Sequence, residues 1–325
     1  MNKNIKKGGL EESSFEVKSV NDWIKEGLKL PKSRPLFGSI WHEHELAILF
    51  GNTGKGKSIN SYQIFDAITK GVRVLGLETT KLRALYLDFE LSKRSLANRY
   101  SNIENVHYSF NENFLRAEIN FDVIDFENDS VENGILRQIE AHIVKYKARV
   151  ICIDNISYIS SNNEKGSDAS KLIKGLLKIS KSLNVAILII AHRPKIQIPN
   201  SPVTLDHLAG SKNLSNFCDQ VFSICDSIKS SDTIYIKELK NRNRKMIYDE
   251  QNVIECKIVK DDNFLKFEKI GMGKESDHLH KIKDKTINRL DEILSMKEEG
   301  VSNVKIAKKL KVSEGTIRKI LKDNN

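Results

Sequence analysis

Apolar residues recur along this chain in two ways, as short continuous runs and as longer stretches in which they stand three or four positions apart. Continuous runs are typical of buried strands, and the wider spacing is typical of helices that cover them. The two patterns alternate through the first two thirds of the chain. They predict strands at 45–50, 84–89, 149–153 and 185–190 and helices at 58–69, 91–103, 131–147 and 168–183. We therefore expect an α/β fold with a mainly parallel central sheet covered by helices.

The pattern changes on both sides of this region. Four later segments alternate apolar and polar residues between short polar turns, which predicts antiparallel strands at 220–225, 233–239, 253–259 and 264–270. Residues 271–276, Gly-Met-Gly-Lys-Glu-Ser, have the composition of a linker. A polar start precedes a helical pattern at 17–30. The expected parts are a tail and linker helix at 1–34, a core domain at 35–271, a linker at 272–283 and a helical domain at 284–325.

A glycine-rich segment follows the first predicted strand and opens the first helix. It consists of Gly51, Asn52, Thr53, Gly54, Lys55, Gly56, Lys57 and Ser58. In this context the backbone N–H groups of such a loop and the start of its helix surround a polyphosphate. Lys57 is then expected to reach the β- and γ-phosphates, and Ser58 to hold magnesium. The sequence thus predicts ATP and Mg²⁺ as ligands.

Hydrolysis of ATP also needs a second magnesium ligand and a carboxylate that activates water. Asp154 ends the apolar run 150–153, where it would lie beside Ser58. Ligand sites in such sheets lie beyond the carboxyl ends of the strands. Asp88 and Glu90 both fall at such an end and share strand parity, so either can face the site. We favour Glu90 because it is further out.

Several motifs occur in one order along the chain: the glycine-rich loop, Asp88-Phe89-Glu90-Leu91-Ser92 running into Arg99, Asp154-Asn155, Ala191-His192-Arg193-Pro194-Lys195, Ala209-Gly210-Ser211 with Asp219, and Lys240-Asn241-Arg242. Over about residues 35–270 the chain resembles the RecA-like ATPases of the plasmid RepA and DnaB helicase type. The resemblance implies that Glu90 activates water and that His192 senses the γ-phosphate.

The same resemblance implies catalysis between subunits. Lys240 and Arg242 match the basic pair that reaches into a neighbouring subunit's site, so a homo-oligomer, a hexameric ring, is expected. In such rings the loops after the Asp154 and His192 strands hold DNA in the central channel. Arg193 and Lys195, with Lys165 and Lys212, are the candidates for this contact.

The C-terminal segment at 301–321 resembles a helix-turn-helix. Ser302 and Ser313 stand where helix N-caps are expected, Ala307 is small enough for two helices to cross, and Lys311 occupies a turn position where glycine is common. The second helix would present four residues to a major groove. These are Glu314, Thr316, Arg318 and Lys319. The alternative is a helical hairpin that packs on a neighbouring subunit or another protein.

Composition adds to this interpretation. The chain has 325 residues, a formal net charge of +10 and a pI near 9.2, which favour a polyanionic partner such as DNA. The longest apolar run, 185–191, is too short to span a membrane. The start has no secretory pattern, and four scattered cysteines without a CxxC pair are typical of a reducing compartment, so we expect a cytoplasmic protein.

These features together predict an ATP-dependent, DNA-associated ATPase, a ring-forming replicative helicase or motor of a plasmid or mobile element. The alternative is a non-helicase ATPase, an ATP-gated DNA-binding regulator or recombination accessory protein. A DNA-binding protein with a defunct nucleotide loop is a third interpretation. The intact Lys57, Ser58, Asp154 and Glu90 argue against it.

Overall fold

The computed structural model describes residues 15–118, 131–155, 167–192, 202–208, 215–279 and 292–322. It divides into two units, Met1–Ser33 and Arg34–Asn325. In the first unit, α1 (Val20–Lys29) begins after Ser19, whose hydroxyl caps the helix by accepting from the Asp22 amide. None of the α1 residues is buried, and the apolar side chains of Val20, Ile24 and Leu28 are exposed.

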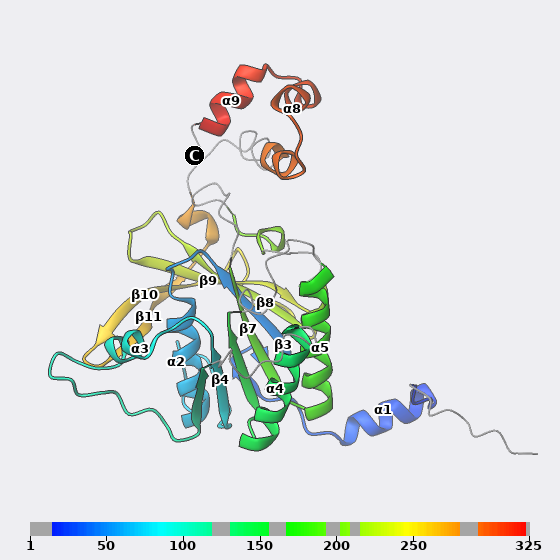
Figure 1. Ribbon diagram of the computed structural model, residues 1–325, viewed down its shortest axis with the longest axis vertical. Helices are drawn as coiled ribbons and strands as arrows, with labels where there is room; N and C mark the ends of the chain where they lie inside the picture. The colour runs from blue at the N-terminus through cyan, green and yellow to red at the C-terminus, as the bar shows by residue number, and fades with distance from the viewer. Residues whose placement is uncertain are drawn as a thin grey trace, which may run out of the picture. The chain divides into compact units, whose positions relative to one another are not determined.

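A nine-stranded sheet forms the centre of the second unit (Figure 1). The strand order is β11-β10-β9-β8-β3-β7-β6-β4-β5. Six strands are parallel: β8 (Gln220–Asp226), β3 (Leu46–Gly51), β7 (Ala186–His192), β6 (Val150–Asp154), β4 (Ala84–Asp88) and β5 (Phe114–Glu118). The sheet ends in antiparallel pairs with β9 (Thr233–Asn241), β10 (Val253–Asp261) and β11 (Phe264–Gly273). The predicted α/β fold with a mainly parallel sheet and antiparallel end strands is confirmed.

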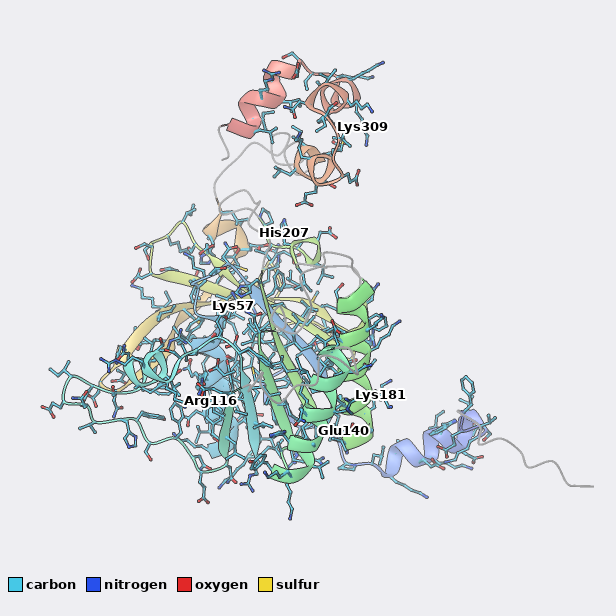
Figure 2. The ribbon with its side chains drawn as sticks, viewed as in Figure 1. Lys57, Arg116, Glu140, Lys181, His207 and Lys309 are labelled. Atoms are coloured by element: carbon cyan, nitrogen blue, oxygen red, sulfur yellow. The ribbon has the colours of Figure 1, made fainter. Side chains whose placement is uncertain are left out.

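Helices cover both faces of this sheet (Figure 1). On one face, α2 (Lys57–Lys70) packs Ile64, Phe65 and Ile68 against alternate residues of β3 and its neighbours. On the other, α4 (Val131–Tyr146) and α5 (Ser167–Leu183) bury Ile139 and Leu176 against the opposite side. Side chains fill the space between the layers (Figure 2). Because both faces are covered, the β3, β4, β6 and β7 strands are apolar without interruption, which is why the sequence predicts them.

Other elements differ from the prediction. β5 was not predicted, because its residues Phe-Leu-Arg-Ala-Glu are only half-buried at the sheet edge. The pair β1 (Pro35–Phe37) and β2 (Trp41–His42) is too short for any pattern. The third helix, α3 (Lys93–Arg99), is shorter than predicted: Ser92 caps its start, and Tyr100 turns into a cluster of aromatic side chains at its end.

The predicted linker at 272–283 is wrong in its first half. β11 continues to Gly273, paired with Val253 of β10, and a 3₁₀ turn, η4 (Glu275–His278), follows. Glu275 is buried and accepts from the Lys237 ammonium at 2.5 Å, and His278 is fully buried. A polar, glycine-containing composition suggested a linker, but these polar groups are paired inside the core. Residues 280–291 lie outside the described residues.

The described C-terminal part has its own small core. Residues 292–298 are helical, and α8 (Asn303–Leu310) and α9 (Glu314–Lys322) follow. Their shared core consists of Ile293, Met296, Ile306, Ala307 and Ile317. Lys311 itself adopts the left-handed conformation, with φ 54° and ψ 45°, that glycine usually takes there. Ser313 caps α9 through the Thr316 amide, whereas the Ser302 side chain makes no cap bond.

Candidate active site

The glycine-rich loop joins the end of β3 to the start of α2. Gly54 and Gly56 have φ angles of 77° and 82°, which side chains other than glycine rarely adopt. A Cβ atom on Gly56 would also lie 2.7 Å from the Phe267 ring and 2.9 Å from Ile258. The antiparallel end of the sheet therefore packs directly against the loop, and both constraints explain why the chain has glycine at this position.

A pocket of about 260 Å³ opens beside this loop. Its walls come from the loop, α2, the β4–α3 connection and the ends of β6 and β7. The lining residues are Thr53, Gly54, Gly56, Lys57, Ser58, Ile59, Glu90, Leu91, Arg99, Asp154 and His192. The structure thus brings together Lys57, Ser58, Glu90, Asp154 and His192, which the sequence placed on four separate segments.

Lys57 is buried at the first position of α2. Its ammonium donates to the carbonyls of Gly51 and Asn52, both at 2.9 Å. Burial lowers the pKa of Lys57, and the nearby carboxylates of Asp154 and Glu90 oppose that shift. The loop residues Asn52 and Lys55 instead contact Asp226, at 2.6 and 2.7 Å. These contacts fix the loop to the end of β8, while Lys57 stays directed to the pocket.

Asp154 ends β6 with a buried carboxylate. Its Oδ2 accepts from the Tyr86 hydroxyl at 2.7 Å, and Oδ1 has no hydrogen-bond partner among the described residues. Burial raises the pKa of Asp154 to about 6, and the Ser58 and Tyr86 hydroxyls counteract part of that shift. A buried carboxylate oxygen without a donor, beside the loop serine, fits a magnesium ion, which needs one or two protein ligands and completes its shell with phosphates and water. In the described part of the chain, no three acidic, His or Cys side chains are grouped so that they alone could hold a metal ion.

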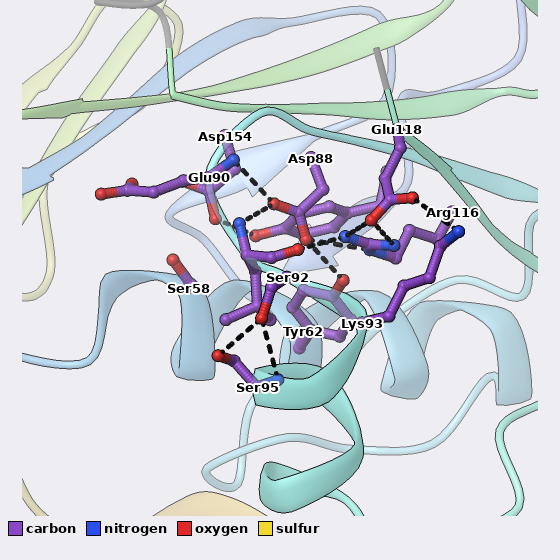
Figure 3. Close-up of polar contacts among 12 residues, drawn as sticks. Ser58, Tyr62, Asp88, Glu90, Ser92, Lys93, Ser95, Arg116, Glu118 and Asp154 are labelled. Atoms are coloured by element: carbon purple, nitrogen blue, oxygen red, sulfur yellow. Dashed lines mark hydrogen bonds and ion pairs between the residues drawn. The ribbon is translucent and has the colours of Figure 1, made fainter. Parts of the chain in front are cut away.

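Asp88 and Glu90 have different surroundings (Figure 3). Asp88 is buried, and its Oδ1 accepts from the amides of Glu90 and Leu91 at 3.2 and 2.8 Å. Its Oδ2 accepts from Arg116 Nε and the Tyr62 hydroxyl, both at 3.0 Å. Asp88 therefore stabilises the turn that presents Glu90, whose side chain is 44 % exposed and lines the pocket. Of the two carboxylates, Glu90 is therefore the one that faces the pocket.

His192 ends β7 opposite Glu90. Its Nε2 lies 2.6 Å from the Asn155 amide nitrogen and 4.0 Å from Glu90 Oε2. Asn155 also donates to Glu90 Oε2 at 3.1 Å. Burial lowers the pKa of His192, and the Lys57 charge lowers it further, while Glu90 opposes both effects. His192 therefore contributes a neutral ring to the edge of the pocket.

Lys240 and Arg242 do not line this pocket. The Lys240 ammonium donates to the Ser215 carbonyl at 2.6 Å, and Arg242 donates to the Asn216 carbonyl at 2.7 Å with Asp219 3.6 Å away. Both lie at the end of β9 beside β8. Burial, followed by the Arg242 charge, lowers the pKa of Lys240. Their predicted role in a neighbouring subunit stays a prediction.

Of the candidate DNA contacts, Thr316 and Arg318 are exposed on α9. Arg318 pairs with Glu314 at 2.8 Å on that helix, and Lys319 lies in the same helix. The loop candidates are Arg193, Lys195, Lys165 and Lys212, and all four lie outside the described residues.

Arg99 and Asn155 occur in the sequence motifs but had no assigned role. Arg99 lines the pocket from the last turn of α3, and its NH1 group is buried without a hydrogen-bond partner among the described residues. An arginine nine positions after the candidate base is the only sequence signal for it. Asn155 follows Asp154, and its bridge between Glu90 and His192 depends on the order of strands, which the sequence does not reveal.

Comparison with known families gives a match. The family described as AAA domain matches residues 11–197, which is more than half of the chain. The matched region includes the glycine-rich loop, Glu90, Asp154 and His192, but neither Lys240 nor the C-terminal helices. A comparison with curated proteins finds no match. In the described part of the chain, no helix is both long and apolar enough to cross a lipid bilayer.

Proposed function

The chain belongs to the AAA-domain family of P-loop ATPases, and we propose on this basis that it is a DNA-associated ATPase that hydrolyses ATP between subunits of a ring. The observation that carries the proposal is the pocket itself, in which a buried lysine, a serine, two carboxylates and a neutral histidine come together. Each has a counterpart among the groups that phosphoryl transfer to water requires.

The proposed roles follow from position and charge. Lys57 and the loop amides bind the β- and γ-phosphates, and Arg99 adds a second positive charge on the other wall. Ser58 and Asp154 would hold Mg²⁺, which supplies positive charge against the phosphate oxygens. Glu90, the more exposed carboxylate, accepts a proton from the attacking water, and His192 donates to a γ-phosphate oxygen.

Assembly into a homo-oligomer is part of the proposal. Lys240 and Arg242 bind carbonyls near 215–216 and lie away from their own pocket, as expected of groups that act on a neighbour. The exposed apolar residues of α1 are also compatible with burial against a second copy. A hexameric ring is the assembly that the RecA-like resemblance implies.

DNA is the proposed partner. The net charge of +10 favours a polyanion, and α9 exposes Thr316 and Arg318. A replicative helicase or motor of a plasmid or mobile element is our first candidate. An ATP-gated DNA-binding regulator is the second, because the C-terminal helices have a core of their own and can select a site without strand separation.

ATP hydrolysis measured with and without single-stranded and duplex DNA tests the proposal. We expect wild-type hydrolysis that DNA stimulates, no hydrolysis by Lys57→Ala, and unchanged hydrolysis by Lys181→Ala, an exposed lysine on α5 (Figure 2). Displacement of a strand from forked DNA separates the candidates, since only a helicase performs it. Hydrolysis that no DNA affects, together with no DNA binding, would contradict the association with DNA.

A further inference from the structure

We propose that Asn155 is a positioning residue that links the water-activating carboxylate to the γ-phosphate sensor. The inference rests on the proposed ATPase function and adds a residue to it. The Asn155 amide nitrogen donates to Glu90 Oε2 at 3.1 Å and lies 2.6 Å from His192 Nε2. The two acceptor atoms are 4.0 Å apart, so each takes a different hydrogen of the same amide.

This bridge joins the ends of three neighbouring strands of the sheet. Asn155 follows the end of β6, Glu90 follows the end of β4, and His192 ends β7. In the sheet, β6 lies between β4 and β7, so a residue at its end is the one able to reach both neighbours. Asn155 is 1 % exposed, and a buried amide cannot exchange these partners for water.

The bridge also determines how the histidine presents its proton. Because both hydrogens of the amide point outward from Asn155, His192 Nε2 must accept, and the ring proton of the neutral histidine is on Nδ1. His192 Nδ1 is buried with no hydrogen-bond partner among the described residues, and His192 lines the phosphate pocket. In our proposal this Nδ1–H group donates to an oxygen of a bound phosphate.

The side-chain amide of Asn155 has two proposed functions. Asn155 holds Glu90 on the phosphate side of its turn, and it holds His192 in the tautomer that recognises the γ-phosphate. Loss of the amide should release both side chains without removing the groups that bind the β-phosphate, which are the loop amides and Lys57. If Asn155 had only a structural role, its substitution would lower the stability of the protein but would not change the preference for ATP analogues over ADP.

The test measures hydrolysis and binding in Asn155→Ala, in Asn155→Asp, which keeps the size but replaces the donor by an acceptor, and in Asn102→Ala. Asn102 is the matched control, because its amide also donates to a carboxylate, Asp262 at 3.1 Å, outside the pocket.

We expect kcat to fall by about 10- to 100-fold in both Asn155 variants, as for misplaced catalytic groups. The affinity for ADP should stay within about twofold, and the preference for a non-hydrolysable ATP analogue over ADP should fall by about tenfold. Asn102→Ala should match the wild type.

Combined variants show whether Asn155 acts through its two partners. In a Glu90→Gln background, Asn155→Ala should slow hydrolysis little further, and in a His192→Ala background it should not reduce the analogue preference again. Equal losses of ADP and analogue affinity, an unchanged kcat or additive effects in these backgrounds would overturn the proposal. Should Asn155→Ala unfold, as judged by its melting temperature, the Asn155→Asp results decide. If the wild type hydrolyses no ATP, the proposed function fails, and the analogue preference still tests the bridge.

Discussion

Asp88 and Glu90 stand two residues apart at one strand end, and only their surroundings separate their functions. The residues of the glycine-rich loop and Asp154 could be predicted from the sequence, because adjacent residues determine the geometry of a loop and of a strand end. Adjacent residues alone do not determine which of the two carboxylates, Asp88 or Glu90, faces the pocket. This depends on Arg116, a residue of the unpredicted strand β5, which takes up the charge of Asp88 and leaves Glu90 facing the pocket.

We expect a substitution of Asp88 to make the folded protein less stable. Asp88→Asn removes the charge that pairs with Arg116, whose side chain is only 17 % exposed, and weakens the turn before Glu90. We expect a decrease of roughly 3 kcal/mol in the free energy of unfolding, the lower end for one partner of a buried pair. Chemical denaturation measures it. Glu118→Gln is the control, because the loss of that exposed partner of Arg116 should have a much smaller effect. Equal effects of the two variants would contradict this account.

Among the helices and strands, the sequence pattern predicts the buried strands of the sheet but not the edge strand β5 or the turn η4. β3, β6 and β7 are apolar up to their last residues because both sheet faces are covered, whereas the edge strand β5 and the turn η4 contain charged residues whose partners lie on other strands. The order of strands also lay beyond the sequence pattern. Asn155 reaches both Glu90 and His192 only because β6 lies between β4 and β7.

The ion pair between Lys237 and Glu275 lies near the C-terminal end of the core domain, so we expect truncation on either side of Glu275 to have different effects. Removal of 280–325 should leave a stable core, whereas removal of 275–325 takes away Glu275 and leaves the buried Lys237 ammonium without its carboxylate. A buried charge that loses its partner costs about 3 to 5 kcal/mol. We expect the shorter protein to melt roughly 10 °C lower, because each kcal/mol shifts Tm by about 2–4 °C at this size. Thermal melts of both proteins test this, and equal melting temperatures would show that the core ends before Glu275.

For the whole molecule, the C-terminal helices are the proposed means of recognising DNA. Removal of 280–325 should weaken duplex binding while ATP hydrolysis continues. Arg318→Ala should relax base preference at a cost of about 1 to 3 kcal/mol, and Lys319→Ala should weaken binding on all sequences and reduce its salt dependence. Binding isotherms at several salt concentrations on specific and random duplexes separate these effects. If truncation leaves duplex affinity unchanged but reduces the mass in solution, the helices serve assembly.

Catalysis between subunits is a further proposed property of the assembled protein. Arg242→Ala should bind nucleotide nearly as well as the wild type but lose hydrolysis, since Arg242 lies outside its own pocket. A mixture with Lys57→Ala should regain part of the activity, because one variant supplies an intact phosphate site and the other an intact arginine across the shared interface. Hydrolysis rates over a series of mixing ratios provide the test. No recovery in confirmed mixed assemblies would contradict catalysis in trans.

In the proposed mechanism this pocket hydrolyses ATP, and Glu90 is the group that activates water. Single-turnover hydrolysis with nucleotide affinity measured in parallel tests it most directly, with Glu140→Gln on the exposed side of α4 as the control (Figure 2). We expect Glu90→Gln to bind ATP like the wild type and to hydrolyse it roughly 100-fold or more slowly, and we expect Glu140→Gln to be unchanged. Wild-type hydrolysis by Glu90→Gln would contradict the account.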